Sequence, residues 1–356
     1  MYRLLLWGIA DPEGLRAIPP ITPNINLQTF RAFGTGKSTE QVCRSNSSAA
    51  TDMPLNRVLL IGGTGNLGSL VLKYLLASPS RLTITVLSRR SSSANTAYPP
   101  GVSVAEIDDD YPSAQLVDAF HNADVVISAI SMSGMHHQRK FIDACVEAKV
   151  QRYIPTEFGL DDLPQWLLDL RPMFKTKHDV RDYLASKEDT GLTWTSICCN
   201  VFFEMGIESG FFQFHWSEKK AVLVGDETVQ WPATTLSTVA TAVVRVIEKE
   251  EPTANKILLI QDFMTSQKEI LDEIQRHTGK WDVEKRELDP WLEEAKENVK
   301  QGHNDGLPKL TFAVARTAGD WRENERFANA LLELPTKTFE KEIGPVIRSM
   351  REKQQM

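Results

Sequence analysis

Cysteine is scarce in this chain, with four residues among 356. They are Cys43, Cys145 and the adjacent pair Cys198 and Cys199, and no two of them have the C-x-x-C spacing. This argues against a disulfide framework and against a cysteine-rich metal site. Cys198 and Cys199 fall in an apolar run, where thiols usually act as small buried hydrophobes. We therefore expect a cytoplasmic protein of a reducing compartment, with no bound metal.

Long apolar runs and blocks of basic residues are also missing. No apolar stretch reaches the roughly 18 residues needed to span a bilayer. The apolar core of residues 1–14 is soon interrupted by acids, and no small-residue cleavage site follows it, so we expect no secretory signal. With a net charge of −7 and no Lys/Arg block, the sequence also argues against nucleic-acid binding.

Residues 1–53 show neither helical nor strand periodicity, and 38–52 is a Ser/Ala/Thr-rich patch. We expect this segment to be a disordered N-terminal extension. Its arginines leave an organelle address as the alternative. Transit peptides are usually poor in acids, however, and this segment contains Asp11, Glu13 and Glu40.

Strand-like and helical segments alternate from residue 57 onwards. The run RVLLI at 57–61 is continuously apolar, as in a strand covered on both faces, and helical spacing follows at 69–77 and 137–149. Further strand-like runs lie at 82–87, 102–107, 123–130, 150–155 and 192–198. The alternation predicts an α/β fold with a Rossmann-type, doubly wound parallel sheet.

A glycine loop, GGTGNLG at 62–68, joins the first strand to the first helix. Gly63, Gly65 and Gly68 match G-x-G-x-x-G, and Gly62, Gly65 and Gly68 match G-x-x-G-x-x-G. Glycines permit a tight turn and a close approach of the backbone to a pyrophosphate, and the helix start adds N–H groups and positive potential. With the required strand before it and helix after it, the loop predicts a dinucleotide site.

The residues after the second strand indicate which dinucleotide binds. An NAD site usually has an acid about 20 residues after the glycines, but no acid occurs between Asp52 and Glu106. Arg89 and Arg90 stand at the expected position, and a guanidinium suits a 2′-phosphate. We predict NADPH, with Arg89 ahead of Arg90 because it is closer to the strand.

The pattern becomes looser after residue 200, and 201–216 is dense in aromatic residues. The short strands and amphipathic helices expected beyond it lie at 220–225, 256–260, 290–300 and 326–334. We expect an NADP-binding Rossmann lobe at 54–200 and, at 201–356, mostly a smaller C-terminal substrate-binding lobe with C-terminal helices.

One lysine of the segment MFKTKHDVRDYLASK, at 173–187, is unusual. On a helix, Lys177 falls in the middle of the apolar stripe, whereas Lys175 points away among polar residues. An ammonium on a core-facing stripe is costly unless it pairs or opens into a cleft. Snorkelling is the alternative. The same segment spells Tyr-x-x-x-Lys with Tyr183 and Lys187, but Lys187 ends the helix, so we interpret this pair as a coincidence and find no support for a nucleotide-sugar epimerase.

These motifs resemble the NmrA-like, isoflavone-reductase-like group of atypical short-chain dehydrogenases over about residues 56–350. GGTGNLG resembles the glycine motif of the group, RYIPTEFGLD at 152–161 its signature after the fifth strand, and NVFFEMG at 200–206 its active-site region. MFKTK resembles the Phe-x-x-Lys that bears the catalytic lysine, which implies Lys177 as catalytic residue after Phe174.

The resemblance also implies a set of cofactor contacts. Arg89 would hold the 2′-phosphate, Phe158 would lie near the nicotinamide, and Arg181 would contact cofactor or substrate. The pyrophosphate would be held by Gly62, Thr64, Gly65, Asn66, Leu67 and Gly68. The chain departs from the family in one respect: a lysine some nine residues after the arginine is missing, which weakens the expected preference for NADP.

The sequence leaves the roles of two groups of side chains open. His136 and His137 are expected at a helix start, where a solvated position is the ordinary reading. His215 and Trp216 could edge a substrate pocket. The aromatic cluster beside them suits a flat aromatic ligand, although core packing explains its members one by one: Phe202, Phe203, Phe211, Phe212 and Phe214.

Two functions fit these features. The first is an NADPH-dependent oxidoreductase that reduces an aromatic or phenolic small molecule, with Lys177 as general acid/base. The second is a non-catalytic, NmrA-like regulatory protein that senses dinucleotides and contacts other proteins, and it would need no catalytic lysine. The inward position of Lys177 favours the enzyme, acting as a monomer or homodimer.

Overall fold

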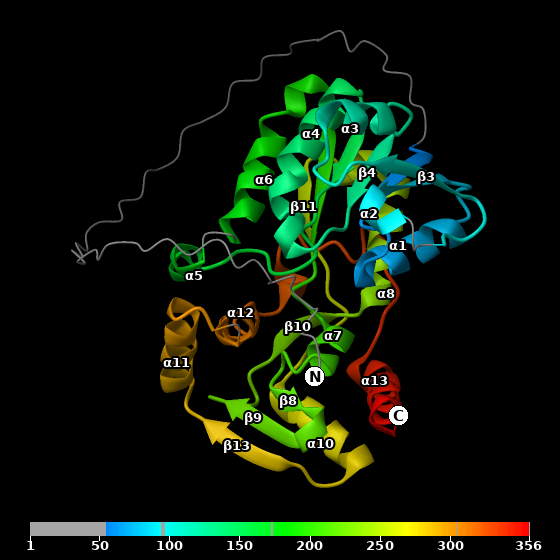
Figure 1. Ribbon diagram of the computed structural model, residues 1–356. Helices are drawn as coiled ribbons and strands as arrows, with labels where there is room; N and C mark the ends of the chain where they lie inside the picture. The colour runs from blue at the N-terminus through cyan, green and yellow to red at the C-terminus, as the bar shows by residue number, and fades with distance from the viewer. Residues whose placement is uncertain (1–54, 94–96, 172–173, 304, 356) are drawn as a thin grey trace, which may run out of the picture. The chain divides into compact units, whose positions relative to one another are not determined.

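A computed structural model describes residues 55–93, 97–171, 174–303 and 305–355 of the chain (Figure 1). The extension expected at 1–53 lies outside these residues, and so does Cys43. Among the described residues, no helix has both the length and the apolar character required to cross a membrane.

Seven parallel strands form the main sheet, in the order β11-β6-β5-β4-β1-β2-β3. Their bounds are β1 (Arg57–Ile61), β2 (Thr83–Arg89), β3 (Val102–Ile107), β4 (Val125–Ser128), β5 (Arg152–Ile154), β6 (Thr193–Cys198) and β11 (Lys256–Leu259). The direction of winding reverses between β1 and β4, which is the point where such sheets bind nucleotides. The predicted Rossmann-type sheet is confirmed.

Helices cover both faces of this sheet. The pair α1 (Asn66–Ala77) and α8 (Leu236–Glu248) packs on one face. The other face is covered by α3 (Ser113–Phe120), α4 (Gln138–Glu147) and α6 (Lys175–Ala185). Both layers are apolar where they meet β1, which explains why RVLLI has no polar alternation.

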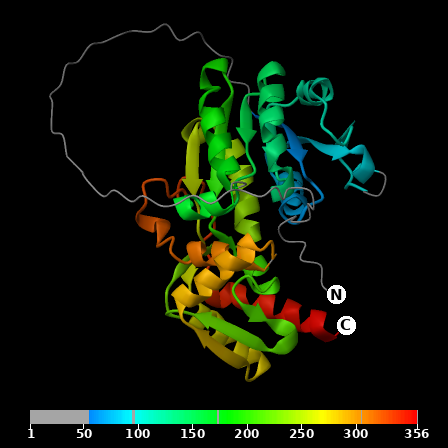
Figure 2. The same ribbon diagram turned by 60° about the vertical axis from the view of Figure 1, so that its left-hand side comes forward.

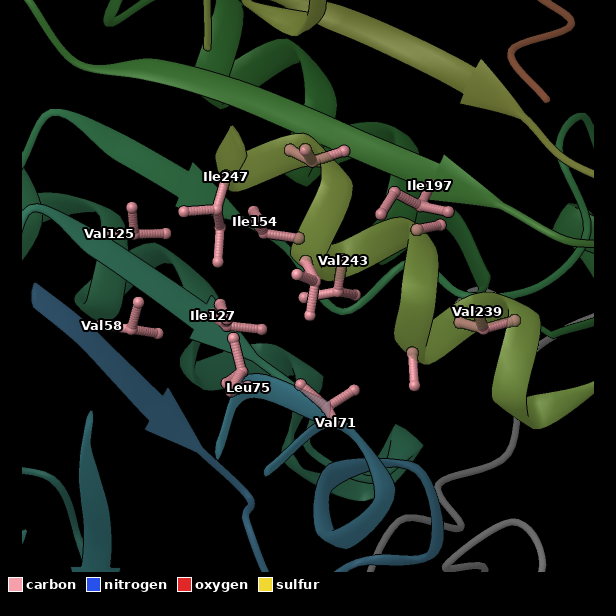
Figure 3. Close-up of a cluster of buried hydrophobic side chains, with 14 of the residues drawn as sticks. Val58, Val71, Leu75, Val125, Ile127, Ile154, Ile197, Val239, Val243 and Ile247 are labelled. Atoms are coloured by element: carbon pink, nitrogen blue, oxygen red, sulfur yellow. The ribbon is translucent and has the colours of Figure 1, made fainter. Parts of the chain in front are cut away.

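Alternate side chains of β1 serve the two layers. Val58 and Leu60 belong to the cluster with α1 and α8, whereas Leu59 and Ile61 belong to the cluster with α3, α4 and α6. Figure 3 shows the first layer, in which Val71 of α1 approaches the strand residues together with side chains of α8. Helices therefore cover β1 on both of its faces.

Two small sheets follow in the C-terminal part, in the orders β12-β10-β7 and β13-β9-β8. Their strands are β7 (Val201–Phe202), β8 (Phe214–His215), β9 (Lys220–Val224), β10 (Trp231–Thr234), β12 (Phe263–Thr265) and β13 (Asp282–Arg286). The remaining helices are α2 (Arg90–Ser93), α5 (Gln165–Leu170), α7 (Phe203–Glu208), α9 (Glu250–Thr253), α10 (Gln267–Thr278), α11 (Leu288–Lys300), α12 (Gly306–Ala315) and α13 (Phe339–Gln355). Figure 2 shows α11 and α12 lying against each other. Strand β11 of the main sheet and helix α8, which packs on that sheet, both lie beyond residue 200 in the sequence. The lobe boundary at residue 200 stays a prediction.

The amphipathic helix expected at 326–334 is wrong. This segment consists of turns. Its start pairs with the edge strand β11: Leu259 N donates to Arg326 O at 2.9 Å, and Ala328 N donates to Leu259 O at 2.9 Å. Completing the hydrogen bonds of an edge strand outweighs the local helical preference of the segment.

The buried carboxylate of Asp124 is hydrogen-bonded to the start of β1, and its contribution to stability depends on pH. Asp124 accepts hydrogen bonds from Arg57 N at 2.8 Å and from the Arg57 side chain. Burial raises the pKa of Asp124, but these hydrogen bonds outweigh it, so the net pKa is lowered. Because its pKa in the folded state lies below that in the unfolded state, the stabilisation is present above about pH 4 and is lost as the pH falls.

We therefore expect Asp124→Asn to lower the free energy of unfolding at pH 7 by about 1–3 kcal/mol. The difference between the variant and the parent should shrink as the pH falls through the folded-state pKa. Urea titrations at several pH values measure it, and a difference that grows towards low pH would contradict the assignment.

Candidate active site

A cavity of about 420 Å³ opens at the carboxyl edge of the main sheet, near the switch point. Its walls come from the glycine loop, from the segments after β4, β5 and β6, and from helices α6, α7 and α12. The residues in these walls include Asn66, Thr156, Phe158, Lys177, Phe202 and Thr311.

The glycine loop forms one wall of the cavity, and two of its glycines, Gly62 and Gly68, leave no room for a side chain. Gly62 has φ +84°, and a Cβ there would overlap the carbonyl group of Ala129. A Cβ on Gly68 would overlap the carbonyl oxygen of Gly62. These two glycines therefore allow β1, the segment after β4 and α1 to approach closely, while Gly65, Asn66 and Leu67 face the cavity.

The start of α1 is suited to an anion. Gly65 is its N-cap, and no described side chain caps the helix through a hydrogen bond. The first N–H groups of a helix carry the positive end of its dipole, so they can bind a pyrophosphate. The absence of room around Gly62 and Gly68 and this uncapped helix start both fit a bound dinucleotide.

The two arginines at the end of β2 and directly after it differ in their contacts. Arg90 forms an ion pair with Asp108 at 2.9 Å, whereas Arg89 contacts Ser92 Oγ at 3.5 Å. Hydrogen bonds from Ser91 lower the pKa of Asp109, and Arg89 and Arg90 contribute to the shift. Asp108 and Asp109, which follow β3, therefore lie close to the end of β2 in the fold, although they are distant from it in the sequence. Because Asp108 already occupies Arg90, Arg89 is the better candidate for a 2′-phosphate.

The loop after β5 carries Phe158 to the cavity. Phe158 is buried and has a φ of +28°, a strained value for a residue with a side chain. Hydrogen bonds on both sides hold it there: Thr156 N donates to Gln138 Oε1 at 2.7 Å, and Gly159 O accepts from Cys199 N and Asn200 N, each at 3.0 Å.

Lys177 lies in the cavity wall, in the first turn of α6. Its side chain is 12% exposed, and Nζ donates to the main-chain carbonyl of Glu157 at 2.5 Å. Phe174, three residues earlier, is buried and lines the same cavity, while Lys175 is exposed. The helix face predicted for these residues is confirmed, and Lys177 is the lysine that reaches the cavity.

Arg181 and the Tyr183/Lys187 pair are not among the described residues that line the cavity. Arg181 is buried behind the wall and bonds to the Glu157 carboxylate. The ring of Tyr183 lies 4.7 Å from Lys187 Nζ, and its hydroxyl bonds to Asp143. The last contact joins α6 to α4, which gives this pair a structural role.

The aromatic cluster divides between the cavity and the core. Phe202 and Phe211 line the cavity. His215 and Trp216, which the sequence places near the edge of a pocket, are not among the described residues that line the cavity. Trp216 packs edge-on against Trp281. The remaining phenylalanines belong to a buried aromatic core: Phe203, Phe212 and Phe214.

His136 and His137 lie in a short 3₁₀ helix, Met132–His137, before α4. The ring of His137 packs 4.9 Å from that of Tyr111, and burial lowers its pKa. His136 is exposed, as expected for a solvated helix start.

Sequence reasoning missed several wall residues. Met132, Leu163 and Thr311 line the cavity, beside Met205 of the expected region 200–206. Thr311 belongs to α12, far from the other wall residues in sequence. Single apolar residues of this kind carry no local signal, because only the folded chain brings them to one cavity.

Comparisons with known proteins agree with the fold. The model of the NmrA-like family matches residues 54–308. Oxidoreductase aprR of Aspergillus flavus is 32% identical over 297 residues, which cover 82% of this chain and 99% of aprR.

Two solved structures share the fold. The crystal structure of isoflavone reductase has a TM-score of 0.62 at 21% identity, and the match covers 82% of this chain and 99% of that one. The structure of AtPrR2 with NADP⁺ and (+)pinoresinol has a TM-score of 0.64 at 19% identity, over 82% of this chain and 98% of the other. At these identities the similarity establishes the fold.

Proposed function

The chain belongs to the NmrA-like family, and we propose that it is an NADPH-dependent oxidoreductase that reduces an aromatic or phenolic small molecule. One observation carries the proposal: Lys177 lines the same cavity as Gly65, Asn66 and Leu67 of the glycine loop at the start of α1. A dinucleotide site and a group that can donate a proton therefore share one cavity of about 420 Å³.

The residues have separate tasks in this proposal. Gly62, Gly65 and Gly68 let the backbone approach the pyrophosphate, and Arg89 binds the 2′-phosphate. When bound, NADPH supplies a hydride. Lys177 Nζ holds the proton that the substrate oxygen receives or shares, and it regains that proton from solvent after turnover.

The apolar half of the cavity supports an aromatic substrate. Phe174, Phe202, Phe211 and Met205 offer flat or adaptable apolar contacts. The nearby hydroxyl of Thr311 donates to the carbonyl of Leu307 at 2.8 Å, so its proton does not require an acceptor on the substrate. The pinoresinol bound by AtPrR2 is an example of a phenolic ligand on this fold.

The arginine after β2 leads to a prediction on cofactor choice. We expect the protein to bind NADPH about 10- to 150-fold more tightly than NADH, the effect of one charge-assisted hydrogen bond of about 1.5–3 kcal/mol. Arg89→Ala should remove most of this preference, because the 2′-phosphate loses its guanidinium. Fluorescence titration with both cofactors measures it.

Arg90→Ala is the matched control, since Asp108 already pairs with Arg90. The variant should keep the preference to within about threefold, less than one such hydrogen bond. Equal affinity of the parent protein for NADPH and NADH would refute the role of Arg89.

The activity itself is tested by following NADPH oxidation at 340 nm with phenolic and carbonyl compounds. Consumption that depends on one of these compounds supports the reductase. If the protein binds NADPH and a protein partner but reduces none of these compounds, the function is that of a non-catalytic regulator.

We place the protein in the cytoplasm because Cys145, Cys198 and Cys199 are free, buried thiols.

A further inference from the structure

The carboxylate of Glu157 lies between two cations behind the cavity wall. Its side chain is 1% exposed, and both partners belong to α6, one turn apart. Arg181 donates from Nε to Oε2 at 3.0 Å, and its Nη2 lies 3.0 Å from Oε1. Lys177 Nζ lies 3.6 Å from Oε1 and bonds instead to the main-chain carbonyl of Glu157.

The two cations therefore compete for one carboxylate, and Arg181 has the closer contacts. Arg181 donates a hydrogen bond to Oε2 and brings its charge to 3.0 Å from Oε1, although Oε1 accepts no hydrogen bond among the described residues. A planar guanidinium can lie against both carboxylate oxygens at once, whereas an ammonium acts as a single point charge. Lys177 remains beyond ordinary hydrogen-bond distance of that carboxylate. At least one of its N–H groups can then point into the cavity.

We propose that Arg181 is a positioning residue for the reaction. By occupying the Glu157 carboxylate, it keeps Lys177 at the long ion-pair distance of 3.6 Å and holds Nζ at the cavity wall instead of hydrogen-bonded to the carboxylate. This inference rests on the proposed function, because it gives Lys177 a reason to be there. It replaces the expected direct contact of Arg181 with cofactor or substrate.

Further contacts fix the guanidinium in place. Arg181 Nη1 lies 3.4 Å from Asp161 Oδ1, and Nη2 donates to Cys198 Sγ at 3.2 Å. Asp161 is held in turn by Arg326, which donates to Oδ2 at 2.6 Å. Arg181 is thus bonded on more than one side and cannot easily turn away from Glu157.

Loss of the Arg181 charge has a defined consequence. A carboxylate buried to 1% exposure with one partner removed is strongly unfavourable, and the nearest remaining cation is Lys177. In Arg181→Met we expect Nζ to close on the carboxylate and leave the cavity wall. Removing the carboxylate as well, in Glu157→Gln/Arg181→Met, removes the reason for this movement.

The test uses the whole protein and measures Lys177 directly. Formaldehyde and cyanoborohydride methylate accessible amines, and mass spectrometry of peptides gives the rate at Lys177. In Arg181→Met we expect this rate and the turnover number to fall by at least about tenfold, while KM changes little. In the double variant both should return to within about threefold of Glu157→Gln alone, the sign of a coupled pair. The exposed Lys175 is the internal control.

A double variant as slow as Arg181→Met would overturn the proposal, because a merely structural arginine predicts no rescue. Unchanged methylation in Arg181→Met would overturn it as well. If Arg181→Met does not fold, Arg181→Lys keeps the charge but loses the two-point contact, and intermediate methylation is expected. The labelling needs no substrate, so it stands or falls separately from the proposed reductase activity.

Discussion

Replacing Lys177 by methionine is expected to lower turnover by about two to four orders of magnitude, the usual effect of removing a general acid/base. Methionine has a similar length and fills the apolar stripe between Phe174 and Val180, so folding and NADPH binding should survive. Steady-state kinetics at 340 nm and a cofactor titration measure the two effects separately.

Three controls come from the same helix or its end. Lys175→Met removes an exposed lysine, while Tyr183→Phe and Lys187→Met disrupt the Tyr-x-x-x-Lys pair that lies away from the cavity. Each should change turnover by less than about tenfold, below the range of a lost acid/base group. A Lys177→Met protein that turns over as fast as the parent would remove the lysine from the mechanism.

The second large effect is expected at Gly68. In Gly68→Ala the new Cβ would overlap the carbonyl oxygen of Gly62 and lie 3.3 Å from Gly63 Cα. Both neighbours are backbone, so the glycine loop or the start of α1 must move. We expect NADPH to bind at least about 100-fold more weakly, a loss of about 2.7 kcal/mol, with a lower Tm.

Gly344→Ala is the matched control for this substitution. Gly344 lies within α13, and a Cβ there would meet Arg348 Nη1 at an ordinary 3.6 Å. Alanine in a helix interior is favoured over glycine by roughly 0.5–1 kcal/mol, so Tm should not fall and NADPH affinity should stay the same. Parent-like affinity in Gly68→Ala would show that the close approach of loop and helix is not required.

The predictable parts of the fold and site are those that short stretches of sequence determine. The strand, glycine loop and α1 are contiguous, and their spacing alone predicts their order. The position of Lys177 follows from the 3.6-residue period, because Val180 and Leu184 mark the buried side of α6. In both cases the residues that form the pattern lie within about fifteen positions of one another in the sequence.

What the sequence could not reveal depends on distant contacts. The helical wheel puts Arg181 beside Lys177, but only the fold brings Glu157 between them. Asp108 reaches Arg90 from the neighbouring strand, although no acid follows β2 in the sequence. At 326–334 the local pattern predicts a helix, but the start of this segment instead forms hydrogen bonds with the edge strand β11.

Deuterium transfer tests the central claim most directly. The parent protein and Lys177→Met are each incubated with NADPH that carries deuterium at the transferable C4 position and with a pool of phenolic and carbonyl compounds. Mass spectrometry then identifies any product that has gained deuterium. The proposed function predicts a labelled aromatic product with the parent protein and at least about 100-fold less of it with Lys177→Met. Bound NADPH without any labelled product, or equal labelling by both proteins, would contradict it.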